Sequence, residues 1–246
     1  MGAVYVVGMG PGGLPHLTLR AMEVLKAADA IVGYTRYVEL IAPLTADKEI
    51  FSTGMTREIE RCEKAIALAR EGKTVAMVSS GDAGIYGMAG LVMQVAMRRG
   101  EPVPIEVIPG VPSFVSAAAI LGAPLMHDFA SISLSDLLTD WEKIEGRLLA
   151  AAKADFVIVL YNPKSGKRTE GLKKAVSIIA AHREGNTPVG IVRNATREGE
   201  DAVITTLSGF HLYYDKIDML TIVIVGNSTT FTHEHRMITP RGYKGV

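Results

Sequence analysis

Short apolar runs rich in valine and isoleucine alternate along the chain with stretches of helical spacing. In the first half, the runs fall at 3–8, 30–33, 74–78 and 105–108, and the helical stretches at 17–27, 57–71, 91–99 and 113–121. Strands that are apolar along their whole length and alternate with helices are typical of a largely parallel sheet covered on both faces. The first half is therefore expected to be an α/β domain.

A glycine and a proline within 121–129 interrupt this alternation, which then resumes. Further runs fall at 156–161, 189–192, 202–206 and 220–226, with helical stretches at 141–154 and 170–182. We therefore predict two α/β domains with mostly parallel sheets, residues 1–124 and 125–246. A ligand cleft is expected between them, near the carboxyl ends of strands.

The charge balance narrows the possible partners. The 26 basic and 26 acidic side chains of the 246 residues cancel, so no basic field exists to attract nucleic acid or an anionic membrane. The single cysteine, Cys62, can form neither an intramolecular disulfide nor a cysteine-rich metal site, which fits a reducing compartment. No basic segment precedes the first apolar run, and no run reaches the ~18 to 20 residues of a membrane-spanning helix. We expect a soluble, cytoplasmic protein.

The sequence GMGPGG at 8–13 matches the dinucleotide-binding pattern G-x-G-x-x-G through Gly8, Gly10 and Gly13. That pattern also needs an acidic residue at the end of the second strand, but Asp29 precedes the strand. Pro11 moreover removes an amide donor from the turn. A nucleotide-dependent dehydrogenase is therefore disfavoured.

Other common catalytic patterns are missing from the sequence. Neither G-x-x-x-x-G-K-[ST] nor G-x-S-x-G occurs. His233 and His235 lie two apart, whereas a helical zinc site uses an i, i+4 pair, so a solvated pair is expected. No dedicated metal site is predicted.

Five turns rich in glycine or other small residues follow apolar strands, at 8–13, 79–84, 109–113, 161–166 and 193–200. Each alone is compatible with an ordinary connection. Together they indicate a lined cleft, because backbone without side chains lets a bulky ligand approach and accept amide hydrogen bonds.

Longer blocks carry a resemblance to a known family. SSGDAGIYGMAG (79–90), PGVPSFVSAAAILGAPLMHDFASISLSDLLTDWE (109–142), ADFVIVLYNPKSGKR (154–168) and ITPRGY (238–243) resemble the tetrapyrrole (corrin and porphyrin) methyltransferases, which use S-adenosylmethionine. One departure is Gly13, where the family usually has aspartate. A carboxylate at that position is therefore not essential to this chain.

The resemblance implies that S-adenosylmethionine lies folded between the two domains, the second of which completes its site. The implied contacts are Pro11, Ser80, Gly81, Asp82, Ile85, Tyr86, Pro112, Ser113, Tyr161, Asn162, Asn194, Ala195 and Thr221. Asp82 is expected to fix polar groups of the ligand or of its own loop. The alternative is that it caps the following helix.

More narrowly, these blocks resemble family members that methylate carbon 17 of a corrin precursor and contract its ring. The substrate is then metal-free precorrin-3B or its cobalt-containing counterpart, with cobalt carried inside the substrate. Methyl transfer is an in-line displacement that needs alignment more than a strong acid. Contraction would be helped by a general base, for which Asp136 and His127 are candidates, although structural roles are equally compatible.

The implied substrate carries many carboxylates, so cations near the predicted loops are candidates to bind them. These are Arg36, Lys164, Lys167, Arg168, Arg193 and Arg197. Solvated surface charge is the alternative for each. The family resemblance also suggests a homodimer.

Two other functions remain open. One is methylation at another ring carbon without contraction. The other is a binding protein that keeps the cleft without turnover.

Overall fold

The computed structural model describes residues 2–100, 102–166 and 168–245. Contacts within the chain divide it into two units, Met1–Ser113 and Phe114–Val246, each of which is described here by itself.

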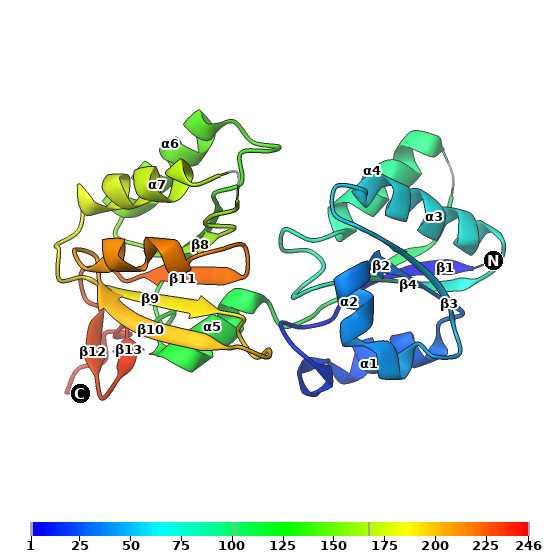
Figure 1. The fold of residues 1–246 in the computed structure, drawn as a ribbon, viewed down its shortest axis with the longest axis horizontal. Coiled ribbons are helices and arrows are strands. Elements are labelled where there is room, and N and C mark those ends of the chain that lie inside the picture. Colours follow the sequence, from blue (N-terminus) through cyan, green and yellow to red (C-terminus); the bar gives the residue numbers. More distant parts are fainter. Residues whose placement is uncertain (1, 101, 167, 246) are drawn as a thin grey trace. The chain divides into compact units, whose positions relative to one another are not determined.

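The first unit is an α/β domain (Figure 1). Its elements are β1 (Ala3–Gly8), η1 (Leu14–His16), α1 (Leu19–Ala27), β2 (Ala30–Tyr34), α2 (Thr35–Leu40), η2 (Ala42–Leu44), β3 (Glu49–Thr53), α3 (Glu58–Arg70), β4 (Thr74–Ser79), α4 (Ala89–Arg99) and β5 (Ile105–Ile108). The five strands have the order β3-β2-β4-β1-β5, and all of their pairings are parallel.

Both faces of this first sheet are covered, as its wholly apolar strands predict. On one face, Cys62 and Ile66 of α3 and Val92 of α4 pack against the sheet. On the other face, Val24 and Leu25 of α1 belong to a separate apolar cluster. The carboxyl ends of the strands are left free for loops.

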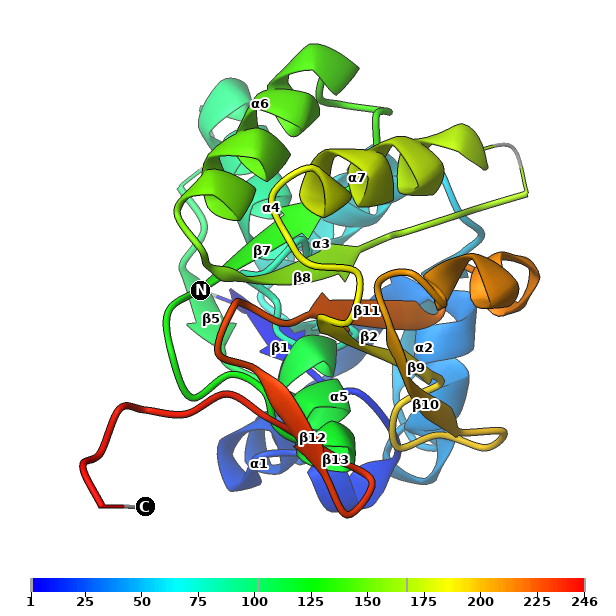
Figure 2. The same ribbon diagram turned by 90° about the vertical axis from the view of Figure 1, so that its left-hand side faces the viewer.

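The second unit contains a five-stranded sheet and a small three-stranded one (Figure 2). Its elements are α5 (Ser113–Leu121), β6 (Gly122–Ala123), β7 (Phe129–Ser133), α6 (Trp141–Lys153), β8 (Val157–Tyr161), α7 (Glu170–Ala180), β9 (Pro188–Arg193), β10 (Asp201–Thr206), η3 (Phe210–Lys216), β11 (Thr221–Val225), β12 (Phe231–His233) and β13 (Arg236–Ile238). Helices α6 and α7 contribute Ile144, Leu148 and Ile179 to the core on one face of the larger sheet.

The α/β class is confirmed, but the strand directions of the second large sheet differ from the expectation. Its order is β10-β9-β11-β8-β7, and only the β7–β8 pair is parallel among the pairings described. The reason is local: β9 and β10 are joined as a hairpin, and β11 lies antiparallel to both of its neighbours. Apolar runs alone do not encode direction.

The boundary between the units lies before Phe114, rather than near residue 125. Helix α5 belongs to the second unit because its side chains pack there. The Phe114 ring lies 5.6 Å from that of Phe129, and a Cβ at Gly190 would lie 2.3 Å from Leu121 Cδ1. Strand β6, which follows α5 directly, pairs with β13.

Candidate functional site

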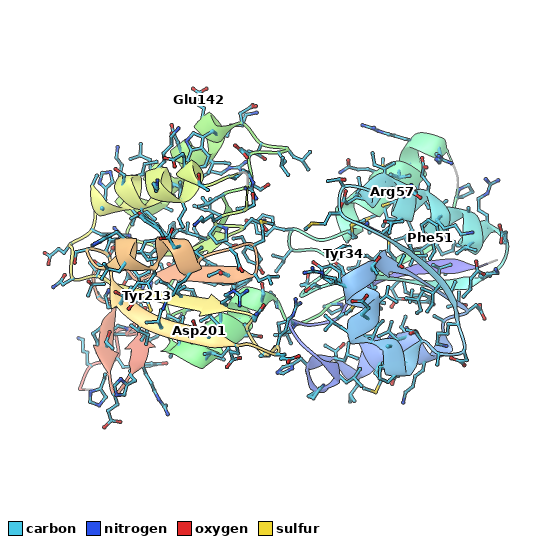
Figure 3. All side chains as sticks on the ribbon, viewed as in Figure 1. Tyr34, Phe51, Arg57, Glu142, Asp201 and Tyr213 are labelled. Carbon is cyan, nitrogen blue, oxygen red and sulfur yellow. The ribbon has the colours of Figure 1, made fainter. Side chains whose placement is uncertain are left out.

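Three loops meet at the carboxyl edge of the first sheet. They follow β1, β4 and β5, which are neighbours in the order β4-β1-β5 and run parallel. The carboxyl end of β2, marked by Tyr34 in Figure 3, lies at the same edge. The sheet therefore brings together the predicted contacts Pro11, Ser80, Gly81, Asp82, Ile85, Tyr86, Pro112 and Ser113.

Glycine backbone holds these three loops against one another. Gly10 and Gly81 exchange two hydrogen bonds, from Gly10 N to Gly81 O at 3.0 Å and from Gly81 N to Gly10 O at 2.8 Å. A Cβ at Gly110 would lie 2.3 Å from Gly81 O and 2.6 Å from the Gly8 carbonyl carbon. No side chain larger than hydrogen fits at Gly110 without moving a loop.

The Asp82 carboxylate ties two of the loops together. One oxygen accepts from Gly84 N at 2.8 Å, and the other accepts from Gly110 N at 3.0 Å. Helix α4 begins only at Ala89, after the N-cap residue Met88, so Asp82 does not cap it. The structure therefore supports the expectation that Asp82 fixes its own loop, and not the alternative that it caps the following helix.

The bareness of these loops thus has a cause within the protein. The sequence interpretation attributed the glycines at 79–84 to a ligand lying against them. The structure shows that a Cβ at Gly8 or Gly110 would lie within 3 Å of backbone atoms and that Gly81 has a φ of 66°, so these positions favour glycine whether or not a ligand is bound. The contacts among Gly8, Gly81 and Gly110 are called the glycine lock below. Ligand contact at this edge stays a prediction, and it involves the residues beside this lock.

Tyr86 is the most unusual residue of the edge. Its φ of 52° lies in the left-handed region, which is rare for a bulky side chain, and its side chain is exposed. Strained backbone of this kind is concentrated at ligand sites. Tyr86 is among the predicted cofactor contacts.

The remaining predicted contacts share one edge of the larger sheet in the second unit. Strands β7, β8 and β9 end there, whereas β10 and β11 begin there, because both run antiparallel to their neighbours. Figure 3 labels Asp201 at the start of β10. The residues brought to this edge are Tyr161, Asn162, Asn194, Ala195 and Thr221.

Two of these residues have left-handed backbone. Asn162 has a φ of 49° and donates from its side chain to Ser133 Oγ at 3.0 Å. Asn194 has a φ of 51° and donates from its side chain to Gly199 O at 3.3 Å. Thr196 follows with a φ of 62°, and its buried hydroxyl has no hydrogen-bond partner among the described residues.

Asp218 organises the loop before β11. Its carboxylate accepts from Arg193 Nε at 2.8 Å, from Leu220 N at 2.9 Å and from the Thr221 hydroxyl at 3.0 Å. Burial acts to raise the pKa of Asp218, but these hydrogen bonds and the charge of Arg193 outweigh it, so the pKa lies below its ordinary value. The Thr221 amide also donates to Asp218 O at 3.3 Å, so both the hydroxyl and the amide of Thr221 hold this loop.

Three of the predicted substrate-binding cations are already engaged within the protein. Lys164 donates to Tyr214 O at 2.7 Å, and Arg193 pairs with Asp218. Arg168 is largely buried and donates to Leu134 O at 3.0 Å. Their first role is therefore to hold the loops.

The other three cations differ in position. Arg36 is exposed on α2, directly after β2 and so at the carboxyl edge of the first sheet. The backbone of Arg197 donates to Asn194 O at 2.8 Å. Lys167 lies outside the described residues.

The two candidate bases lie at opposite ends of β7. Asp136 follows the carboxyl end, where its carboxylate lies 3.9 Å from Arg168 Nε. It does not cap α6, because the N-cap residue of that helix is Asp140. His127 precedes the amino end of β7 and lines a separate hollow of about 390 Å³ with Asp155. The structure therefore does not bring Asp136 and His127 into one site.

Within the described residues, no cluster of histidine, cysteine, aspartate and glutamate has the arrangement of a metal site. Over the same part of the chain, none of the helices has the length and apolar character needed to cross a bilayer.

Sequence reasoning missed two features of the second unit's edge. Asp218 stands three residues before Thr221, a spacing typical of a turn stabilised by an aspartate side chain. Leu137 and Leu138 lie exposed between Asp136 and Asp140. Two adjacent leucines in a polar loop were the available signal.

Comparisons with known proteins agree with the resemblance. The profile of the family described as Tetrapyrrole (Corrin/Porphyrin) Methylases matches residues 3–210. A cobalt-factor III methyltransferase of Priestia megaterium is 51% identical over 99% of this chain, and the chain spans 45% of that protein. A probable cobalt-factor III C(17)-methyltransferase of Salmonella typhimurium is 50% identical over 97% of this chain and 98% of that protein.

Solved structures of methyltransferases also match this chain. The methyltransferase CobJ matches with a TM-score of 0.92 and 33% identity, over 98% of this chain and all of that one. A uroporphyrin-III C-methyl transferase from Thermus thermophilus, in complex with S-adenosyl homocysteine, matches with a TM-score of 0.72 and 26% identity, over 92% of this chain and 97% of that one.

Proposed function

We propose that this chain, which belongs to the tetrapyrrole (corrin/porphyrin) methylase family, transfers a methyl group from S-adenosylmethionine to carbon 17 of a corrin precursor. The chain also contracts the ring of this substrate. The reaction converts cobalt-factor III to cobalt-precorrin-4, or precorrin-3B to precorrin-4, in cobalamin biosynthesis. The observation that carries this proposal is the 50% identity to the Salmonella protein, of which the alignment covers nearly the whole length.

The residues present fit such a donor. Left-handed backbone conformations of residues other than glycine are concentrated at ligand sites in proteins. Three of the proposed contacts have this conformation: Tyr86, Asn162 and Asn194. The buried hydroxyl of Thr196, which has no hydrogen-bond partner in the described part of the chain, lies next to the proposed contacts Asn194 and Ala195. When bound, S-adenosylmethionine supplies a methyl group on a positively charged sulfur.

The work of the protein is then alignment and exclusion of water. The lock of Gly8, Gly81 and Gly110 fixes the backbone around Ser80 and Asp82, and such fixed placement is worth roughly 7 to 11 kcal/mol of the barrier where reacting atoms are well oriented. Each unit supplies its own set of proposed contacts. Asp136 is proposed as the base for contraction, because it lies at the same edge as Asn162.

Incubation with S-adenosylmethionine and either cobalt-factor III or precorrin-3B tests the activity. We expect the product to gain one methyl group, to lose the original chromophore of the macrocycle and to appear with S-adenosylhomocysteine. A methylated but uncontracted product would support methylation at another ring carbon. Tight binding without release of S-adenosylhomocysteine would support a binding protein and contradict the proposal.

The proposed contacts are tested by donor affinity. Asn194→Ala should weaken the binding of S-adenosylhomocysteine roughly 5- to 150-fold in calorimetry, because a polar group of the ligand left without its hydrogen bond costs about 1 to 3 kcal/mol. Asn186→Ala, at an exposed position in the turn before β9, is the matched control and should bind normally. Equal affinities in both variants would remove Asn194 from the site.

The two candidate bases are tested separately. Asp136→Asn should leave donor affinity unchanged and slow contraction, whereas His127→Ala should leave both unchanged. Loss of contraction in the His127 variant alone would reverse this assignment.

The same proposal includes a homodimer and a cytoplasmic location. Sedimentation equilibrium tests the first, and cell fractionation tests the second.

A further inference from the structure

Two adjacent leucines stand almost fully in solvent at the second unit's edge. Leu137 is 75% exposed and Leu138 is 99% exposed, in the loop between β7 and α6. Single exposed apolar side chains are ordinary, but adjacent ones at a functional edge indicate a binding surface.

A second exposed apolar pair lies in the loop before β11, where Met219 is 37% exposed and Leu220 is 43% exposed. Because β11 starts at the edge where β7 ends, both loops belong to one edge of the sheet. Leu137, Leu138, Met219 and Leu220 are called the apolar rim below.

The Arg168 guanidinium braces the two loops of the apolar rim. Its Nη1 donates to Leu134 O at 3.0 Å, and its Nη2 lies 3.2 Å from Met219 Sδ. Its Nε faces the Asp136 carboxylate at 3.9 Å. A planar fork with several donors can reach three groups at once, whereas a lysine cannot.

Cations border the apolar rim. Arg193 is 40% exposed while paired with Asp218, directly before Met219, and Lys164 lies in the loop after β8. Apolar surface bordered by cations complements a ligand that combines a flat apolar face with peripheral carboxylates. A tetrapyrrole has this composition.

We propose that Leu137 and Leu138 pack against the apolar face of the tetrapyrrole substrate and that Arg168 is a positioning residue that holds their loop in place. This inference rests on the proposed function. A second copy of the chain is a poorer occupant, because a stable protein interface takes about 20 to 30 residues a side and the rim has four.

The test compares steady-state kinetics on cobalt-factor III. The double variant Leu137→Ser/Leu138→Ser should raise KM for the tetrapyrrole roughly 10- to 100-fold, from the lost burial of apolar surface. Its affinity for S-adenosylhomocysteine and its Tm should stay those of the wild type. Leu137→Met/Leu138→Met should restore KM, since methionine keeps an apolar side chain of similar size.

The matched control is Met97→Ser. Met97 is 80% exposed in the last turn of α4, which leads to the amino end of β5 and so away from the carboxyl edge of its sheet. Its KM should not change. Arg168→Lys should raise KM for the tetrapyrrole without changing donor affinity, because it keeps the charge but loses the fork.

The outcomes separate this inference from the proposed function. Normal turnover in the double serine variant, with methylation intact in the wild type, would refute the apolar rim and leave the function standing. A dimer that dissociates only in this variant would make the rim a subunit contact and overturn the inference. If affinity for S-adenosylhomocysteine fell by as much as KM for the tetrapyrrole rose, the substitutions would have a general structural effect, and this would also overturn the inference. If the wild type did not methylate the tetrapyrrole, both the proposed function and this inference would be refuted.

Discussion

Substitution of Gly110 tests whether the loops of the first unit are held by close backbone approach. In Gly110→Ala, the new Cβ would lie 2.3 Å from Gly81 O and 2.6 Å from the Gly8 carbonyl carbon and oxygen. Ordinary contacts begin near 3.4 Å and the tightest tolerated ones near 3.0 Å. The loop of Gly81 must therefore retreat by about 0.7 to 1.1 Å, the differences of these distances from 2.3 Å.

Such a shift has two measurable consequences. Overpacking of this kind costs about 1 to 3 kcal/mol of unfolding free energy, which corresponds to a Tm lower by roughly 3 to 10 °C. A displacement near 1 Å next to the reacting groups costs on the order of 100-fold in rate. We expect both a lower Tm in thermal unfolding and a loss of methyl transfer that exceeds what the stability change explains.

Gly146→Ala is the matched control. Gly146 lies within α6, and a Cβ there would meet nothing within 4 Å. Alanine in a helix interior is more stable than glycine by about 1 kcal/mol, so this variant should have an equal or higher Tm and full activity. If Gly110→Ala matches the wild type in Tm, donor affinity and rate, the backbone lock is not what shapes the site.

Four further predictions follow from individual residues. Asp82→Ala should lower unfolding free energy by about 1 to 3 kcal/mol and weaken S-adenosylhomocysteine binding, with partial recovery in Asp82→Asn, because the carboxylate satisfies two amides; denaturant titration and calorimetry measure both effects. Burial acts to raise the pKa of Asp218, but the hydrogen bond from Arg193 and the other donors outweigh it, so folding lowers this pKa from 3.8. The ionised Asp218 therefore stabilises the folded protein fully above about pH 4, and this contribution is lost as the pH falls below that value. The difference in unfolding free energy between wild type and Asp218→Asn should shrink in acid, and a difference constant from pH 3 to 7 would contradict this. Burial raises the pKa of Cys62 from 9.0 to about 12, so native protein should react with a thiol reagent at pH 8 only as fast as it opens, whereas equally fast reaction of folded and unfolded protein would refute the burial. Gly13→Asp should be tolerated with a Tm within about 2 °C and unchanged donor affinity, because a Cβ there meets only Pro15 Cδ at 3.8 Å; a large loss in either quantity would show that the space is needed.

The central strands could be predicted from the sequence, as could the edge strands β5 and β10, whereas the edge strands β3 and β7 could not. The runs that became β1, β4 and β8 are buried along almost their whole length, so their apolar residues are contiguous. Strand β3 lies at an edge and exposes most of its residues, and β7 is likewise only partly buried. Polar residues interrupt the sequences of both missed strands, EIFST and FASIS, so neither contains a long apolar run.

Strand direction and the unit boundary depend on contacts that no local pattern records. Parallel and antiparallel central strands are equally apolar, and the turn at 194–200 that makes β9 and β10 antiparallel was interpreted as a ligand loop. Helix α5 was placed correctly from its spacing. Its membership of the second unit rests on long-range packing such as that of Leu121 on Gly190.

The candidate site was located from glycines and small residues that follow strands, and the structure adds a reason within the protein for some of those glycines. The sequence marks where backbone must be bare, but it does not say whether a ligand or another strand's loop lies against it. Gly81 illustrates the point, since its amide and carbonyl are both used by Gly10 and its Cβ position faces Ser113 N at 3.6 Å. The contacts of Gly8 and Gly110 with neighbouring backbone fix the loops, whereas Tyr86, a proposed ligand contact, keeps its side chain on left-handed backbone.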